Sequence, residues 1–387
     1  MGSMTESSVD RTEILARMML LRACEPVDQA VHELVARRGA VEVAEGILHG
    51  TSGLRNAPTL RSRLPESATN IEDAVSADLR AAERTGARLI VPGDSQWPSQ
   101  LDDLAGRTPL ALWVMGSAHL RLMALRSVSI VGARSATSYG EALARTTAAT
   151  LADRGWLVVS GGAFGIDAAA HRGALDAGGA SACVLAGGVD MAYPRSHEAL
   201  LSRMVTDGLL ISESAMGGAA LRPRFLARNR IISALTRGTV VVEAAVRSGS
   251  RTTAREAASM LRPVMAFPGP VTSAMSAGCH DLLRDRQAIL VTCADDIEAM
   301  LTSFVEHDEP DAARGASNPT PEEQAEVDPR TREGRVLAAL SHRRAAELDR
   351  LVSRTGLSPT DVLVALGLLE AQGLAHRGDQ GWRGAAA

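Results

Sequence analysis

The stretch SGGAFGIDAAAHRGAL, residues 160–175, decides the fold. It follows the apolar run WLVV at 156–159, and its glycines precede an alanine-rich segment, so it predicts a buried strand that turns tightly into a helix. Such a turn exposes backbone N–H groups at the positive end of a helix, an arrangement that favours phosphate. Gly161 and Gly162 would let a phosphate approach the backbone, and Asp167 would cap the helix or brace the loop. A tight turn without a ligand is the alternative.

The same alternation of apolar runs and helix-like segments extends over the centre of the chain. The runs lie at 128–132, 156–160, 181–186, 209–212, 239–243, 263–267 and 289–292. Strands that are continuously apolar are buried on both faces, so the pattern predicts an α/β fold with a doubly wound, mostly parallel sheet. Two more short strands are expected between 88 and 116. Ligands of such sheets bind at the carboxyl ends of the strands, where the glycine turns fall.

The flanking sequence predicts additional domains. Residues 11 to 60 have helical periodicity, which places a helical N-terminal domain at 1–80 and the sheet domain at 81–305. Residues 306–329 contain eight acids, one arginine and four prolines and predict a solvated linker. In 330–387, two helical segments separated by a turn at Gly356 precede a glycine-punctuated hairpin, which predicts a winged helix.

Composition excludes several classes of chemistry. The 387 residues carry a net charge of −4, and all 41 basic residues are arginine, so neither a Schiff-base lysine nor a Walker-type lysine exists. The spacing of the four cysteines along the chain matches no metal-binding motif, which predicts reduced thiols and no metal site. No apolar signal or membrane-spanning stretch is present, so we expect a cytoplasmic protein without a membrane partner.

The first central strand also ends at a phosphate-binding pattern, VGARSATSYG at 131–140, but it lacks the GxGxxG fingerprint of dinucleotide enzymes. No cofactor is therefore expected. Arg134, Ser135 and Tyr139 instead place a guanidinium and hydroxyl groups at a helix N-terminus, where they could hold a phosphate directly.

A basic segment strengthens the prediction of a polyanion ligand. Residues 214–255 contain eight arginines and a single acid, Glu243. The alternative is a face of internal ion pairs, for which one local acid is too few. Ser248 and Ser250, in RSGSRTT, offer further contacts at a strand–helix junction.

Aromatic residues fall in the same turns. The rings of Tyr139, Phe164, Tyr193 and Phe225 could stack on bases, although each could equally be packed in the core. Arg195, in YPRSH, adds a charge. His171 is expected to form a local hydrogen bond, and no catalytic residue is predicted.

Several motifs in order resemble the DNA-processing protein A family, DprA or Smf. They are SIVGARSATSYG, SGGAFGIDAAAHRGAL, GGVDMAYPRSH, ISE, FLARNRIISAL, VVEAAVRSGSRTTAREA, FPGP and GCHDLL, and the resemblance is strong over residues 88 to 300.

The resemblance implies an extended Rossmann-like domain between a SAM-like helical domain and a winged helix. It also implies a dimeric, non-enzymatic protein that binds single-stranded DNA and loads the recombinase RecA in transformation or recombination. The strand pocket implied by position consists of Arg134, Gly161, Gly162, Arg195, Phe225, Arg228, Asn229 and Arg230.

The chain departs from the family pattern at three places. Phe164 replaces a basic residue, so this position can stack but cannot supply charge. His197 replaces an asparagine, and Arg286-Gln287 replaces Gly-Ala in a segment associated with the dimer. The resemblance also implies a dimer or partner edge at His280, Leu283 and Ile289.

Two rival functions remain open. A Rossmann-like nucleotide phosphoribohydrolase would need a PGGxGTxxE loop, which GGAFGID lacks, and RSGSRTTAREA has Glu256 but the wrong glycines. A duplex-DNA regulator could act through the winged helix.

The segment FLARNR at 225–230 permits two geometries. Arg228 and Arg230 are two residues apart, so on a regular helix they cannot face one point. We expect either an irregular start of the helix, or one arginine on phosphate and the other bracing the loop.

Overall fold

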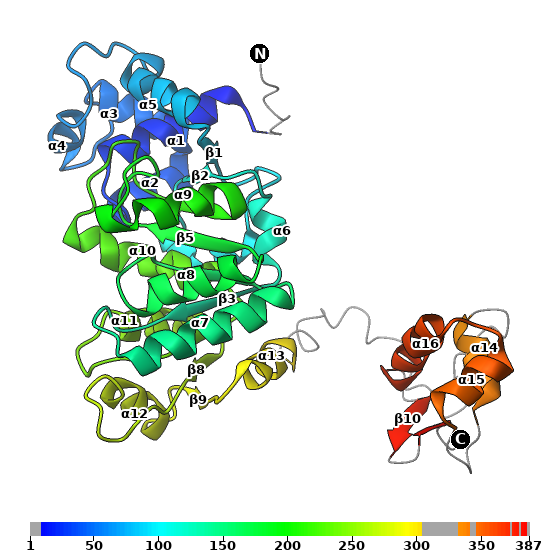
Figure 1. Cartoon of the computed structure of the whole chain (residues 1–387). Coiled ribbons are helices and arrows are strands. Elements are labelled where there is room, and N and C mark those ends of the chain that lie inside the picture. Colours follow the sequence, from blue (N-terminus) through cyan, green and yellow to red (C-terminus); the bar gives the residue numbers. More distant parts are fainter. Residues whose placement is uncertain (1–8, 304–331, 341–345, 372–373, 379–380, 385–387) are drawn as a thin grey trace, which may run out of the picture. The chain divides into compact units, whose positions relative to one another are not determined.

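The computed structural model describes residues 9–303, 332–340, 346–371, 374–378 and 381–384 (Figure 1). These fall into two compact units, one up to Asp308 and one from Glu309 onward. Each unit is described by itself. The linker predicted at 306–329 lies outside the described residues.

A nine-stranded sheet forms the centre of the first unit, counted over the residues described above. Its order is β1-β2-β6-β5-β4-β3-β7-β8-β9, and all pairs from β6 to β9 are parallel. The antiparallel strands β1 and β2 extend it beyond β6. The predicted doubly wound sheet is confirmed, with strands β1 Arg88–Ile90, β2 Leu112–Met115, β3 Ser127–Val131, β4 Leu157–Ser160, β5 Ser181–Leu185, β6 Leu209–Ser212, β7 Thr239–Val241, β8 Val264–Ala266 and β9 Ile289–Leu290.

Two hydrophobic layers bury the sheet. On one face Ile130 and Val158 pack with residues of α7, α8 and α13, and on the other Val159 and Val241 pack with α10 and α11. Strand order reverses between β3 and β7, so the loops after these strands diverge at the carboxyl edge.

The remaining elements of this part are α6 Leu120–Ala124, α7 Ser138–Asp153, α8 Ile166–Asp176, α9 Glu198–Asp207, α10 Arg222–Leu235, α11 Ser250–Ser259, α12 Ala277–Arg284, α13 Ala294–Ser303 and the 3₁₀ segments η1 Ser99–Arg107 and η2 Arg195–His197.

The N-terminal helices pack on the β1–β2 end of the sheet (Figure 1). Their apolar residues share one core cluster with Trp113 and Leu210 of the sheet, so this part and the sheet are one compact unit. Helix α5 starts at an Asn70 cap and ends at the left-handed Gly86, past the boundary expected at residue 80. The helices are α1 Arg11–Ala23, α2 Gln29–Arg38, α3 Ala40–Leu48, α4 Ala57–Arg61 and α5 Ile71–Thr85.

The second unit contains three helices and a hairpin among its described residues. Helices α14 Arg332–Ala339, α15 Leu348–Thr355 and α16 Pro359–Ala371 enclose a small core of Val336, Leu351 and Leu366. Strands β10 Ala375–Gly378 and β11 Gly381–Gly384 pair antiparallel and form the wing. The predicted winged helix is confirmed.

No helix within these described ranges has the length and hydropathy that a membrane span requires.

Candidate nucleic-acid interface

A cavity of about 740 Å³ opens at the carboxyl edge of the sheet, at the point where strand order reverses. Its walls are the loops that follow β3, β4 and β7, together with the first half of α10. The predicted residues among those that line it are Arg134, Ser135, Phe225, Arg228, Asn229, Ser248 and Ser250. The structure thus brings together residues from three separate sequence motifs.

Four arginines surround this cavity. Arg134, Arg222 and Arg247 are exposed at its rim, and the guanidinium of Arg228 is buried at its floor. None of the four forms an ion pair with a carboxylate of residues 9–303. Asp167 is the one acid among the lining residues. The cavity therefore has an excess of positive charge in a partly desolvated site, where charge–charge interactions are strong.

Arg228 is held in place by backbone carbonyls. Its Nη1 donates to Gly161 O at 2.6 Å and to Val184 O, and its Nε donates to Asn229 Oδ1 at 3.1 Å. Burial lowers the pKa of Arg228, while the charge of Asp167 opposes this shift, and a guanidinium stays protonated in any case. A fixed positive charge at the floor of the cavity results.

The glycine turn after β4 has a different role from the one predicted for Gly161. The Gly161 N–H donates to the Asp167 carboxylate at 3.2 Å, and a Cβ on Gly161 would lie 2.3 Å from the Arg228 guanidinium. Any side chain at this position would therefore displace the Arg228 guanidinium from the carbonyls that hold it, and the Gly161 N–H has an internal partner in place of the predicted phosphate. A phosphate contact by Gly162 stays a prediction. Burial raises the pKa of Asp167, while Arg228 and the Gly161 and Ala163 N–H groups counteract the shift.

Glu243 fixes the opposite wall. Its fully buried carboxylate accepts from the Thr137 hydroxyl at 2.6 Å and from the Thr137 N–H at 2.9 Å, at the start of α7. Its carbonyl accepts from Ala133 N at 2.7 Å. These bonds tie the loop that carries Arg134 to the end of β7, so Glu243 positions that loop.

Aromatic rings lie on one side of the cavity. The Phe225 ring is 5.1 Å from the Arg134 guanidinium carbon and 5.7 Å from that of Arg228, and its centroid is 5.4 Å from that of Tyr193. The contacts combine cation–π and ring–ring attraction. Tyr139, Phe164 and Arg195 are exposed but lie outside the lining, and their roles stay predictions.

The expectation of an irregular start in FLARNR is wrong, because α10 is helical from Arg222 and contains the whole segment. Arg228 and Arg230 consequently point to different sides. Arg230 is outside the cavity lining, and its Nη2 lies 2.7 Å from Glu213 Oε2 while its Nε donates to Arg107 O at 2.8 Å. It braces η1, whereas the glycine turn is contacted by Arg228 through Gly161 O, and a phosphate contact by Arg228 stays a prediction.

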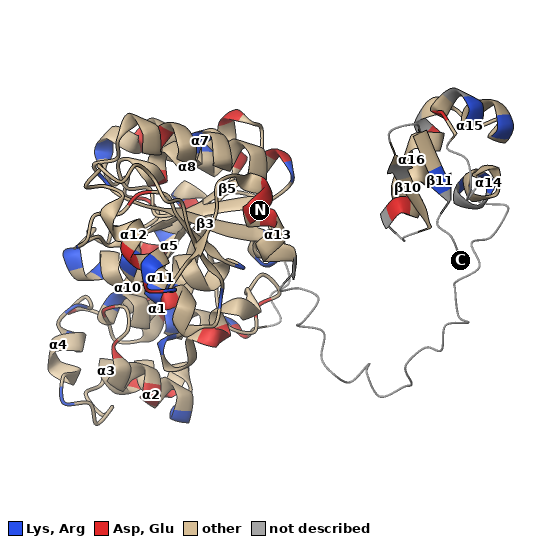
Figure 2. Cartoon of the chain, turned by 90° about the horizontal axis from the view of Figure 1, so that it is seen from below, with Lys and Arg blue, Asp and Glu red and all other residues tan. Residues whose placement is uncertain are grey.

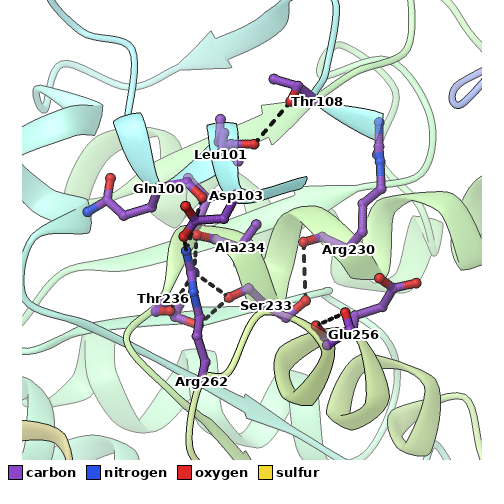
Figure 3. Close-up of polar contacts among 12 residues, drawn as sticks. Gln100, Leu101, Asp103, Thr108, Arg230, Ser233, Ala234, Thr236, Glu256 and Arg262 are labelled. Atoms are coloured by element: carbon purple, nitrogen blue, oxygen red, sulfur yellow. Dashed lines mark hydrogen bonds and ion pairs between the residues drawn. The ribbon is translucent and has the colours of Figure 1, made fainter. Parts of the chain in front are cut away.

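Arg262 braces the same region (Figure 3). It donates to the carbonyls of Ser233, Ala234 and Thr236 at the end of α10, and to Gln100 O and Asp103 of η1. Cations at a helix C-terminus complement its dipole. Arginine in this chain therefore serves the fold as well as the cavity.

The argument that one local acid cannot pair the basic segment is wrong in part. Three arginines of this segment form ion pairs with acids from outside 214–255. The pairs are Glu25 with Arg224, Glu213 with Arg230 and Asp281 with Arg251. Figure 2 accordingly shows acidic segments beside the arginines of α10 and α11. Of the other five arginines, Arg222, Arg228 and Arg247 line the cavity, whereas Arg237 and Arg255 do not.

The edge expected for a dimer lies at the far end of the sheet. Ile289 is exposed on β9, the last strand in the order, and His280 and Leu283 are half-buried on α12. The strands β3, β7 and β8 lie between β4 and β9 in the sheet, so this edge is separated from the glycine turn after β4.

His171 forms the local hydrogen bond that was predicted for it, behind the glycine turn. Its Nδ1 lies 2.7 Å from Ser181 Oγ, whose own proton goes to Val158 O at 2.8 Å, so Nδ1 carries the hydrogen. Its Nε2 is buried without a partner among the described residues, as suits a neutral ring. Burial lowers the pKa of His171 to about 3, and the charge of Arg228 contributes.

This neutral histidine makes stability depend on pH. In the unfolded chain its pKa is about 6.5, so below that value the unfolded state binds a proton that the folded state excludes. The free energy of unfolding should therefore fall by about 2 kcal/mol between pH 7 and pH 5 on account of His171. Urea unfolding at both pH values measures this, and His171→Asn should show a smaller fall. An identical fall in the variant would contradict the assignment.

Sequence reasoning missed Arg222, Arg247 and Leu226 as lining residues. Both arginines belong to the basic segment and were visible there, but their position relative to the turns depends on where α10 begins and on the path after β7.

Comparison with known proteins shows the family to which the chain belongs. A family model described as DNA recombination-mediator protein A matches residues 88–302, and one described as a DprA winged helix domain matches 319–381. A putative DNA processing protein DprA from Mycobacterium tuberculosis is 42% identical over 374 residues, or 94% of this chain and 92% of the relative.

Two solved structures are similar over most of their own length. DprA from Streptococcus pneumoniae has a TM-score of 0.62 at 30% identity and covers 75% of this chain and 98% of its own. DNA processing protein A from Helicobacter pylori, described for its single-stranded DNA binding mode, has a TM-score of 0.50 at 26% identity and covers 57% and 96%. The motifs, the sheet with its winged helix and these matches together show that this chain belongs to the DprA/Smf family of DNA-processing proteins.

Proposed function

We propose that this protein binds single-stranded DNA in the cytoplasm at the cavity beside β3, β4 and β7. We further propose that it shields incoming or recombining strands and loads RecA on them, acting as a homodimer. The observation that carries the binding proposal is the set of Arg134, Arg222, Arg228 and Arg247 around a cavity whose lining has one carboxylate.

The chemistry of the cavity suits a strand without fixed sequence. The exposed guanidinium groups can each fork onto phosphate oxygens, and Arg228 adds a fixed charge beneath them. Phe225 and Tyr193 supply ring faces for bases. A duplex keeps its bases stacked inside and cannot offer them to these rings, so single strands should be favoured.

The rival functions have less support. A phosphoribohydrolase needs a catalytic glutamate, but the described lining contains none, and Glu256 pairs with Arg107 at 2.8 Å. In a winged helix that reads duplex DNA, the helix corresponding to α16 enters the major groove. Here its exposed residues include Leu363, Val364 and Leu368, which cannot read base edges by hydrogen bonds.

The homodimer is supported by the sheet edge. Within the part of the chain that the structure describes, β9 pairs on one side only, with β8, and it exposes Ile289 and Leu290. An unpaired edge with apolar side chains favours association with another chain.

A salt titration tests the binding proposal. Affinity for single strands should exceed that for duplexes and should fall steeply and linearly on a log–log plot against salt, because arginine–phosphate contacts dominate. Removing residues 306–387 should leave most of this binding intact, since the cavity lies in the first unit. Strong preference for one base sequence would contradict binding through phosphate contacts. Loss of nearly all binding on truncation would place the site in the removed residues.

A further inference from the structure

Phe164 presents a half-exposed ring just outside the cavity, with 50% of its surface accessible. The preceding Ala163 lines the cavity. The following Gly165 has φ +72°, and a Cβ there would lie 2.4 Å from Ala133 O and 2.7 Å from Arg134 O. The backbone of this loop is therefore pressed against the segment that carries Arg134, which places Phe164 beside the arginine cavity.

The ring of His197 packs against the ring of Phe164. The two ring centroids are 4.7 Å apart at an interplanar angle of 66°, an edge-to-face arrangement. His197 is itself buried, and its Nδ1 lies 3.0 Å from Gly162 O, which can only accept, so Nδ1 donates. One residue thus fixes both the glycine turn and the orientation of Phe164.

A ring with this geometry is suited to a base and not to a phosphate. It has no charge, it keeps about half of its surface in water, and its orientation is already fixed, so stacking costs little conformational entropy. Arg134 at the rim and Ala163 line the same cavity, so a nucleoside attached to a phosphate on Arg134 would be within reach of the loop that carries Phe164.

From these contacts we propose that Phe164 is a second base-stacking platform beside the arginine cavity and that His197 is its positioning residue. The proposal rests on the proposed binding of single strands. It makes part of the affinity depend on bases and not on phosphates, and this part is insensitive to salt.

The test compares oligothymidylate with an abasic oligomer of the same length, which keeps every phosphate. Phe164→Leu should weaken binding of oligothymidylate roughly 5- to 20-fold, leave the abasic oligomer unaffected and leave the salt slope unchanged. Phe164→Trp should retain or increase the affinity for oligothymidylate. Leu122→Ala, at a 61% exposed position on α6, is the matched control and should change neither.

The role of His197 is tested by a double-mutant cycle. His197→Ala should weaken oligothymidylate binding more in the native background than in the Phe164→Leu background, where only its bond to Gly162 O is lost. If Phe164→Leu weakens the binding of both oligomers equally, or does not weaken binding at all, then Phe164 is not a base-stacking platform. Additive losses would overturn the positioning role. Failure of the proposed function looks different, because the unaltered protein would then bind neither oligomer.

Discussion

Replacing Arg230 with alanine is expected to lower the free energy of unfolding by about 3–5 kcal/mol, because it leaves a buried carboxylate without its partner. The Arg230 and Glu213 side chains are 2% and 4% exposed, and the ion pair between them is 2.7 Å long. Arg230 also donates to Arg107 O and Ala227 O, so the change removes one of the contacts that join α10 to η1. Urea unfolding measures the loss.

A paired replacement separates charge from packing. Changing both Arg230 and Glu213 to methionine should recover much of the stability, since no unpaired buried charge then remains. Single-strand affinity and salt slope, measured where Arg230→Ala is still folded, should match the native values. A variant that unfolds like the native protein but binds DNA weakly would instead place Arg230 on the strand.

The combined change of Arg222 and Arg247 to alanine should weaken single-strand binding roughly 30- to 100-fold at moderate salt, which corresponds to about 1.0–1.4 kcal/mol for each phosphate contact. Each lost contact removes about 0.7 from the slope of log affinity against log salt, so the slope should decrease by about 1.4. Both side chains are exposed, so the fold should persist.

The matched control removes the same charge elsewhere. Arg121 and Arg172 are exposed and lie outside the cavity lining, and changing both to alanine should have a much smaller effect on affinity and slope. If the two double variants lose affinity equally, then net charge and not the cavity determines binding.

Arg230 forms an internal ion pair whereas Arg222 lines the cavity, and the sequence alone could not assign these different roles. The basic segment was visible as eight arginines, but which of them pair internally depends on acids that are distant in the chain, such as Glu25 with Arg224. Helical geometry allowed the sequence to say that Arg228 and Arg230 diverge. It did not say which of the two faces the cavity.

By itself, the sequence determined the layered sheet, the glycine turn, the winged helix and the family, because these depend on local periodicity and on motifs in fixed order. The tertiary structure alone decided what Gly161 does, since its requirement for glycine comes from the guanidinium of Arg228, 67 residues away in the chain. It likewise decided that His197 braces Phe164 and that Glu243 holds Thr137. Such contacts join residues whose distance is set by how the sheet folds back on itself, and no spacing along the chain encodes that distance.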